Sequence, residues 1–307
     1  MDRLDKQLLL KLLCNCRLPY RQLAEELGVT CPTIKRRVDL LIETGIVRGF
    51  TVELSQETLD VNWVIAEITS DMTEDRAGLI ADICSHHATK ETFAVGSNRY
   101  IIFAEISHPE GTYEYGKYLR SLQSVEALEI ECAQQIPTAQ LSHRCKYNSR
   151  GKKVEFSSEH LETLKYLASD ARMPIQELAE KTGFKPKRLR RILRELMDGG
   201  GVHFTISLNP ISRNCISFIL RMSFDETLTS SEEVVTMLED EFPLEYWMTF
   251  MLTSRPVLVN YMTCYNLAKV ENLLRRMKQI PYLHNVETML IYHIEKPQEN
   301  GVLLMSN

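Results

Sequence analysis

Apolar residues near the start of the chain recur at helical spacing. Ile34, Val38 and Leu41 stand at i, i+4 and i+7, which places them on one face of a helix. Gly28 suits the end of a preceding short helix, and Thr30 is a good N-cap for the next one. The pattern predicts two helices joined by a sharp turn, the second with an apolar back and a largely basic front. The front residues are Pro32, Lys35, Arg36 and Asp39, with Thr33 at the flank.

After a predicted strand at residues 48–54 the periodicity changes to alternating strand-like and helical runs. The predicted order is strand, helix, strand, strand, helix, strand, which is that of the ferredoxin-like split βαβ unit. The ranges are 63–69, 74–87, 91–95, 100–106, 110–122 and 125–136.

The second part of the chain repeats the first at a shift of 155 residues. Twelve positions between residues 9 and 47 are identical to their counterparts without a gap, among them Gly28 with Gly183 and Arg36 with Arg191. The strand and helix order recurs between residues 215 and 295. The predicted fold is therefore α+β, a tandem repeat of a winged helix-turn-helix followed by a ferredoxin-like βαββαβ domain.

Domain boundaries are placed where the periodicity changes. They give a first winged helix-turn-helix, a first ferredoxin-like domain, a polar and basic linker, a second winged helix-turn-helix and a second ferredoxin-like domain. The ranges are 1–54, 60–138, 139–156, 157–208 and 213–297.

Charge is distributed unevenly along the chain, whose net charge is −5. Residues 1–50 hold nine Lys/Arg against six Asp/Glu, and residues 157–207 hold nine against seven. Residues 139–156 hold five against one, so the rest of the chain is strongly acidic. Two basic headpieces on acidic bodies direct a polyanion toward the headpieces.

No membrane, cofactor or metal signal accompanies this pattern. No apolar run approaches the length of a membrane span, and the N-terminus resembles a domain helix rather than a signal peptide. We therefore expect a cytoplasmic protein with free thiols at its eight cysteines. The cysteines form no C-x-x-C pair, so we expect neither a metal site nor a cofactor.

The stretch from Gly28 to Phe50 resembles the Leu-responsive regulatory protein/AsnC (Lrp/AsnC) family of transcription factors. The matching motifs are Gly28-Val29-Thr30, Ile34, Arg37-Val38 and Gly45-Ile46-Val47-Arg48-Gly49-Phe50. The resemblance implies an archaeal or bacterial regulator that binds double-stranded DNA and is not an enzyme. It also implies regulatory domains that mediate dimerisation and often bind amino acids. The two domains of one chain could pair with each other as a pseudo-dimer, or each could pair with its counterpart in a second chain. Because two exposed sheet faces would remain to be covered, we expect a homodimer.

The resemblance places the DNA contacts on the two recognition helices, which would enter the major groove. The first set comprises Thr30, Pro32, Thr33, Lys35, Arg36 and Arg37. The second set comprises Lys185, Lys187, Arg188, Arg190, Arg191 and Arg194. Because the second helix is more basic and has Ile192 in place of the family arginine, we expect the first to read bases and the second to grip phosphate.

A small-molecule effector would bind at the turn that the family uses for this purpose. The candidate residues are Gly96, Asn98, Arg99 and Arg255. Both turns lack the usual acid and carry an arginine instead, so we do not expect a conventional amino-acid effector. The arginines could hold an anionic ligand, but the preferred interpretation is that they are solvated turn residues.

Two alternatives stay open. Sirohaem decarboxylases resemble this family in fold, and such an enzyme should gather histidines and arginines where its regulatory units meet. The corresponding strands here contain one histidine, His293. The other alternative is a ligand-sensing protein that has lost DNA binding.

Overall fold

The computed structural model describes residues 2–141, 153–209 and 215–297. These residues form two compact units, and each unit draws on both halves of the sequence. One contains Met1–Asp60 and Gln140–Asn209, and the other contains Val61–Ala139 and Pro210–Gln298. Among the described residues, no helix has the length and apolar character needed to cross a membrane.

The first headpiece is built from three helices and a strand. They are α1 (Arg3–Cys14), α2 (Tyr20–Leu27), α3 (Cys31–Glu43) and β1 (Val47–Leu54). Gly28 ends α2 with φ +67°, a left-handed conformation that glycine adopts without a Cβ penalty. The Thr30 hydroxyl then caps α3 by accepting a hydrogen bond from the Thr33 amide. The predicted turn and cap are thus present.

The second headpiece has the same order of elements. They are α7 (Ser158–Leu167), α8 (Ile175–Thr182), α9 (Pro186–Gly199) and β6 (Val202–Leu208). Gly183 ends α8 with φ +73°, as Gly28 ends α2. Lys185 occupies the N-cap of α9 and makes no side-chain capping hydrogen bond there. The repeat read from the sequence is therefore a repeat of structure, with a weaker cap in its second copy.

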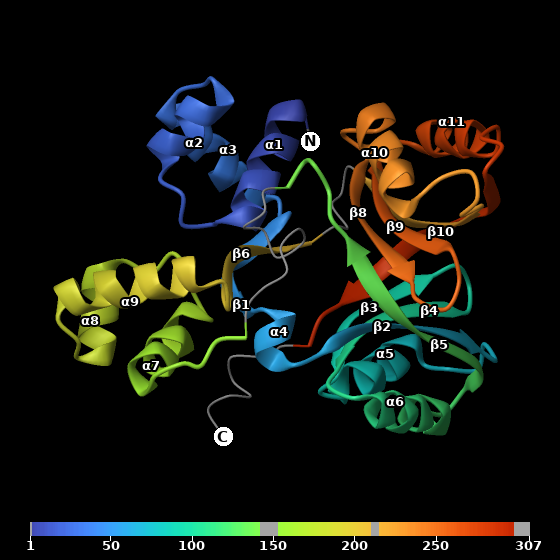
Figure 1. Ribbon diagram of the computed structural model, residues 1–307, viewed down its shortest axis with the longest axis horizontal. Coiled ribbons are helices and arrows are strands. Elements are labelled where there is room, and N and C mark those ends of the chain that lie inside the picture. The colour runs from blue at the N-terminus through green and yellow to red at the C-terminus, as the bar shows by residue number, and fades with distance from the viewer. Residues whose placement is uncertain (1, 142–152, 210–214, 298–307) are drawn as a thin grey trace. The chain divides into compact units, whose positions relative to one another are not determined.

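The two headpieces pair with each other through their strands. β1 and β6 form an antiparallel two-stranded sheet in which Thr51 lies opposite Thr205 (Figure 1). The two threonine hydroxyls donate to the carbonyl oxygens of Ala168 and Leu13, each in the opposite headpiece. Equivalent residues thus make equivalent bonds across an approximate two-fold axis.

Two arginines make further reciprocal hydrogen bonds between the headpieces. Arg17 donates to the carbonyl oxygens of Ala171 and Met173, and its counterpart Arg172 donates to those of Cys16 and Leu18. Arg172 also lies 4.6 Å from the ring centroids of both Tyr20 and Phe50. Because all of these arginine–carbonyl bonds join residues more than 150 positions apart, the headpieces of one chain form a pseudo-dimer.

The second unit contains two ferredoxin-like halves. The first half has β2 (Asn62–Ser70), α5 (Arg76–Ser85), β3 (Thr89–Val95), β4 (Arg99–Ile106), α6 (Pro109–Ser121) and β5 (Val125–Ile136). The second half has β7 (Ile216–Phe224), α10 (Ser231–Glu241), β8 (Tyr246–Leu252), β9 (Val257–Cys264), α11 (Leu267–Met277) and β10 (Leu283–Glu295). A short helix, α4 (Gln56–Leu59), precedes them in the chain.

The eight strands of the two halves close into one barrel, in the order β10-β3-β4-β2-β5-β8-β9-β7 (Figure 1). The seams between the halves are β5 with β8 and β10 with β3, both antiparallel. Closure leaves no free sheet edge, which removes a common route to further strand pairing. The expected homodimer stays a prediction, but exposed sheet faces no longer argue for it, because the two halves cover each other's.

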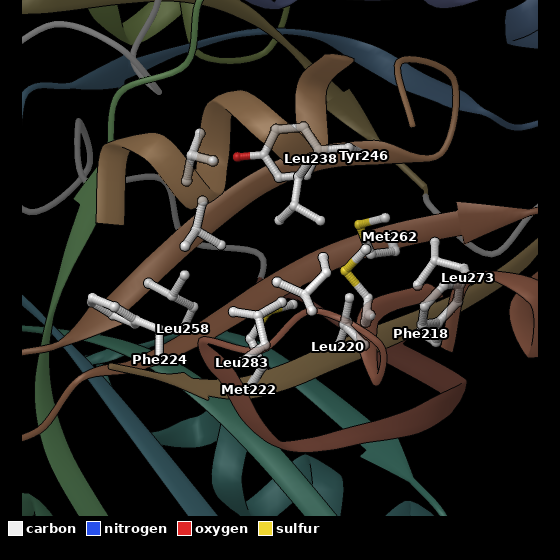
Figure 2. Close-up of a cluster of buried hydrophobic side chains, with 14 of the residues drawn as sticks. Phe218, Leu220, Met222, Phe224, Leu238, Tyr246, Leu258, Met262, Leu273 and Leu283 are labelled. Carbon is white, nitrogen blue, oxygen red and sulfur yellow. The ribbon is translucent and has the colours of Figure 1, made fainter. Parts of the chain in front are cut away.

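Apolar side chains fill three layers of this unit. Each half packs its two helices on the outer face of its strands, as Figure 2 shows for Phe218, Leu220, Met262 and Leu273 of the second half. A third cluster lies between the halves. It includes Ile65, Phe103, Phe250 and Met289, from four different strands. Truncating one such side chain to alanine typically costs about 2–5 kcal/mol.

Candidate nucleic-acid interface

The exposed front of α3 carries mixed chemistry. Lys35, Arg36 and Asp39 are exposed, and Thr33 is half-buried at the flank. Pro32 is exposed in the first turn, where its missing N–H leaves no helical bond unmade. The Thr30 hydroxyl, besides its capping bond, lies 2.9 Å from the Thr33 hydroxyl. The front of α3 thus offers donors and an acceptor that could face base edges in a groove.

Arg37, predicted from the family motif to contact DNA, points elsewhere. Its guanidinium lies 2.6 Å from the Asp2 carboxylate and 2.9 Å from that of Asp5, both at the start of α1. The Arg37 side chain is 24% exposed, and the hydrogen bonds that it donates to Asp2 and then to Asp5 raise its pKa. Its role in this arrangement is to hold α3 against α1, because the guanidinium is already engaged by two carboxylates.

The exposed front of α9 is almost purely cationic. Lys187, Arg190, Arg191 and Arg194 stand at i, i+3, i+4 and i+7 and are all exposed. Lys185 is exposed at the N-cap. Arg191 makes an i,i+4 pair with Glu195 at 3.1 Å, which leaves its guanidinium 63% exposed. These cations form a continuous positive stripe along the helix, as phosphate binding requires.

Arg188 belongs to a tie between α7 and α9 rather than to this stripe. Its Nε donates to the Glu159 carboxylate at 2.9 Å, and this bond lowers the pKa of Glu159 and raises that of Arg188. Next to it, His160 Nε2 lies 3.0 Å from the Glu195 carboxylate. His160 Nδ1 accepts a hydrogen bond from the Ser157 amide in a capping box, which leaves Nε2 as the ring nitrogen that can donate to Glu195. Sequence reasoning missed Glu159, His160 and Glu195. Only the alignment of Asp5 with His160 pointed toward them.

The candidate effector residues of the first turn are engaged in internal bonds. Gly96 adopts φ +63°, and the Asn98 amide donates to the Ser70 carbonyl oxygen. Arg99 donates to Glu67 through Nε at 2.7 Å and to Glu287 at 2.6 Å. Burial opposes the charged form of Arg99, but these two carboxylates raise its pKa overall.

Arg255, in the second turn, is also paired. Its Nε donates to Glu131 at 3.0 Å, and its second guanidinium nitrogen lies 3.4 Å from Glu129. Burial alone would raise the pKa of Glu131, but hydrogen bonds from Arg255 and Ser254 lower it overall. Because both turn arginines are neutralised by carboxylates, this geometry does not favour an anionic effector at either turn.

Three of these glutamates, Glu67, Glu129 and Glu131, line a hollow of about 20 Å³ in the barrel. Its floor is apolar, and its rim is charged. The lining residues are Ile65, Glu67, Ile101, Glu129, Glu131, Arg221, Leu252, Val259 and Met289. No histidine is among them. His293 is exposed on β10, where its Nε2 lies 3.2 Å from Glu295.

The cysteines of the described chain are free thiols, as expected. Cys145 lies outside the described residues. Burial raises the pKa of Cys16 to about 12, so this thiol stays protonated at neutral pH. Across the ranges that the structure describes, no group of three or more His, Cys, Asp or Glu side chains could hold a metal ion.

Comparison with known proteins agrees with this arrangement. A model of the AsnC-type helix-turn-helix domain matches residues 1–42, and a model of winged helix-turn-helix DNA-binding domains matches residues 160–200. An HTH-type transcriptional regulator of Pyrococcus furiosus is 32% identical over 145 residues, which are 46% of this chain and 97% of the regulator. One of Pyrococcus horikoshii is 31% identical over 134 residues, covering 42% of this chain and 90% of the regulator.

A solved structure matches the chain over nearly its whole length. The siroheme decarboxylase NirDL aligns with a TM-score of 0.58 at 12% identity, covering 97% of this chain and 94% of that one. At this identity the likeness concerns the fold. The two kinds of comparison therefore agree on a duplicated architecture, and each regulator relative corresponds to about half of it.

Proposed function

This chain belongs to the Lrp/AsnC-type helix-turn-helix regulators, and from that premise we propose that it is a sequence-specific transcriptional regulator that binds double-stranded DNA. Both recognition helices of one chain would enter the major groove. α3 would read base edges through Thr33, Lys35 and Arg36, and α9 would grip phosphates through its cationic stripe.

One observation carries this proposal. Within a single unit, two recognition helices present exposed fronts at equivalent positions, and reciprocal bonds between β1 and β6 hold their headpieces as a pseudo-dimer. Paired helix-turn-helix units bind two half-sites on one duplex. The duplicated chain thus supplies in one molecule what a regulator of half its length obtains by dimerisation.

The barrel interior favours a regulatory role over the decarboxylase alternative. Tetrapyrrole carboxylates require free cationic groups, whereas Arg99, Arg221 and Arg255 are each bound to glutamates. The hollow of about 20 Å³ has room for about one water molecule, far less than a small-molecule site needs. These features support a protein that is not an enzyme, with its chemistry concentrated on the headpieces.

Two further parts of the proposal are the oligomeric state and the cellular compartment of the protein. We keep the expectations of a cytoplasmic protein and of a homodimer, which would form through surfaces other than the closed barrel seams. Light scattering should then give twice the 35.5 kDa of one chain. A mass of about 35 kDa at micromolar concentration would contradict the homodimer and leave the DNA-binding proposal intact.

The proposed function is tested by selecting genomic fragments on the full chain and measuring their affinity by fluorescence anisotropy. We expect selected fragments to bind at least 10³-fold more tightly than random duplex at physiological salt. An absorbance titration with sirohaem is the matched measurement for the alternative. A new Soret-type band together with equal affinity for selected and random DNA would overturn the proposal.

A further inference from the structure

Seven charged side chains from both halves of the barrel are connected by a continuous series of ion pairs where the halves meet. We call this set the charged ring. Its members are Glu67, Arg99, Glu129, Glu131, Arg221, Arg255 and Glu287. Each of the three arginines binds at least one carboxylate of the opposite half. The ring therefore joins the halves by charge, in addition to the two strand seams.

At the centre of the ring, equivalent residues of the two halves touch. Glu67 is the sixth residue of β2 and Arg221 the sixth of β7, and both strands have nine residues. Arg221 donates to the Glu67 carboxylate at 2.8 Å. Two equivalent residues in contact must straddle the pseudo-two-fold axis. The register agrees, since Glu67 lies opposite Glu129 on β5 and Arg221 opposite the equivalent Glu287 on β10.

This contact could not form between identical halves. If two first halves paired, Glu67 would meet a second Glu67, and if two second halves paired, Arg221 would meet a second Arg221. The first half contributes Glu67, Arg99, Glu129 and Glu131 to the ring, a net charge of −2. The second contributes Arg221, Arg255 and Glu287, a net charge of +1. Unlike halves attract, and like halves repel.

The apolar floor below the ring lacks this discrimination. Ile65 is the fourth residue of β2 and Ile219 the fourth of β7, and both are buried in the cluster between the halves. Isoleucine meets isoleucine equally well in any pairing. At this pair of positions the apolar layer has no preference, whereas the charged pair two residues further along the same strands has one.

We propose that the Glu67–Arg221 pair, supported by the charged ring, makes the two halves of the barrel select each other and reject pairing between identical halves. The partner this surface fits is a half of opposite ring charge, normally the other half of the same chain. The inference does not depend on DNA binding, so either can fail without the other.

The first test reverses charges in the full-length chain. E67R and R221E each place like charges astride the axis, and we expect each to lower the thermal midpoint by roughly 5 °C or more. The double variant E67R/R221E restores an opposite pair, although it leaves the new arginine beside Arg99 and the new glutamate beside Glu129, so its loss should be smaller than the sum of the two single losses. The matched controls E271R and R275E reverse an exposed i,i+4 pair on α11 and should change the midpoint by about 1 °C at most. Additive losses in the double variant would overturn the proposal, and E67Q and R221Q serve the same cycle if a reversal does not fold.

The second test measures whether the Glu67–Arg221 pair determines which halves of the barrel pair with each other. The first and second halves of the chain are joined covalently only through residues 139–156, so two chains could exchange their second halves by domain swapping. Differently tagged E67R and R221E chains, unfolded and refolded together, could then form two complementary barrels. One of these barrels carries the wild-type pair and the other the reversed pair, so we expect the mixture to melt higher than either variant refolded alone and to carry both tags in one particle. No recovery beyond that of each variant refolded alone would contradict partner selection.

Discussion

The two headpieces share a fold and differ in what they present. At positions 32, 35, 36 and 39 the first helix has Pro, Lys, Arg and Asp, a net charge of +1. At the equivalent positions 187, 190, 191 and 194 the second has Lys and three Arg, a net charge of +4. Because both headpieces belong to one chain, the second recognition helix need not have the same sequence as the first. The comparison teaches that a pseudo-dimer can divide base reading and phosphate binding between its two helices.

The ties that orient the recognition helices differ as well. In the first headpiece Arg37 on α3 binds Asp2 and Asp5 at the start of α1. In the second headpiece Arg188 on α9 binds Glu159 on α7, and a hydrogen bond between His160 on α7 and Glu195 on α9 adds to this tie. The same mechanical link between first and third helix is thus built from different residues, which indicates that the link itself matters to the headpiece.

The largest expected effect comes from removing the cationic stripe of α9. R190A/R191A/R194A should weaken binding to operator and random duplex alike and flatten the slope of log affinity against log salt by about 2–3, at about 0.9 per phosphate contact. The measurement is anisotropy at several salt concentrations. R275A/R276A, on exposed positions of α11, is the control and should leave the slope unchanged. An unchanged slope in the triple variant would remove the second headpiece from the DNA.

A smaller and more selective effect is expected on α3. R36A should reduce the ratio of operator to random affinity by about 1–3 kcal/mol, the worth of a bidentate base contact. R21A, an exposed arginine on α2 paired with Glu25, is the matched control and should preserve that ratio. If R36A binds both duplexes more weakly by the same factor, Arg36 contacts phosphate, and the proposal that α3 reads bases while α9 binds phosphates is wrong.

Losing the tie in the first headpiece should act through stability. R37A leaves the Asp2 and Asp5 carboxylates without their cation, and we expect a loss of about 1–2 kcal/mol in unfolding free energy, discounted for the partial exposure of the pair. Urea unfolding measures it. Because Arg37 is engaged with α1, the operator preference per folded molecule should be kept. A stable R37A protein that has lost this preference would assign Arg37 to the DNA.

The smallest expected effect is on the pH dependence of the folding stability. The pKa of Glu159 is lowered in the folded state by its bond to Arg188, so this bond contributes stability above the ordinary glutamate pKa of about 4.3 and loses it as pH falls through the lower folded value. E159Q should therefore be less stable than wild type at pH 7, and the difference should shrink toward pH 3. Urea midpoints at both pH values measure this. A difference that grows on acidification would contradict the tie.

The sequence predicted those parts of the molecule that depend on local pattern. The recognition helices, the glycine turn and the alternating elements follow from periodicity, and the duplication follows from identities at a fixed shift. The contacts between distant segments could not be predicted in this way. The partner of β1 lies about 155 residues away, and the engagement of Arg37 depends on where α1 starts in space. For the same reason the glutamates that neutralise Arg99 and Arg255 were not foreseen.

The central claim is that one chain reads DNA with two unlike headpieces. Hydroxyl-radical footprinting of the full chain on a selected genomic fragment tests it most directly. The account predicts two protected patches about one helical turn apart, roughly 34–36 Å, over unlike half-sites. R36A should abolish the sequence preference at one patch only, and the triple arginine variant should lose protection at the other. A single palindromic site protected equally by both headpieces, or no protection at all, would contradict the account.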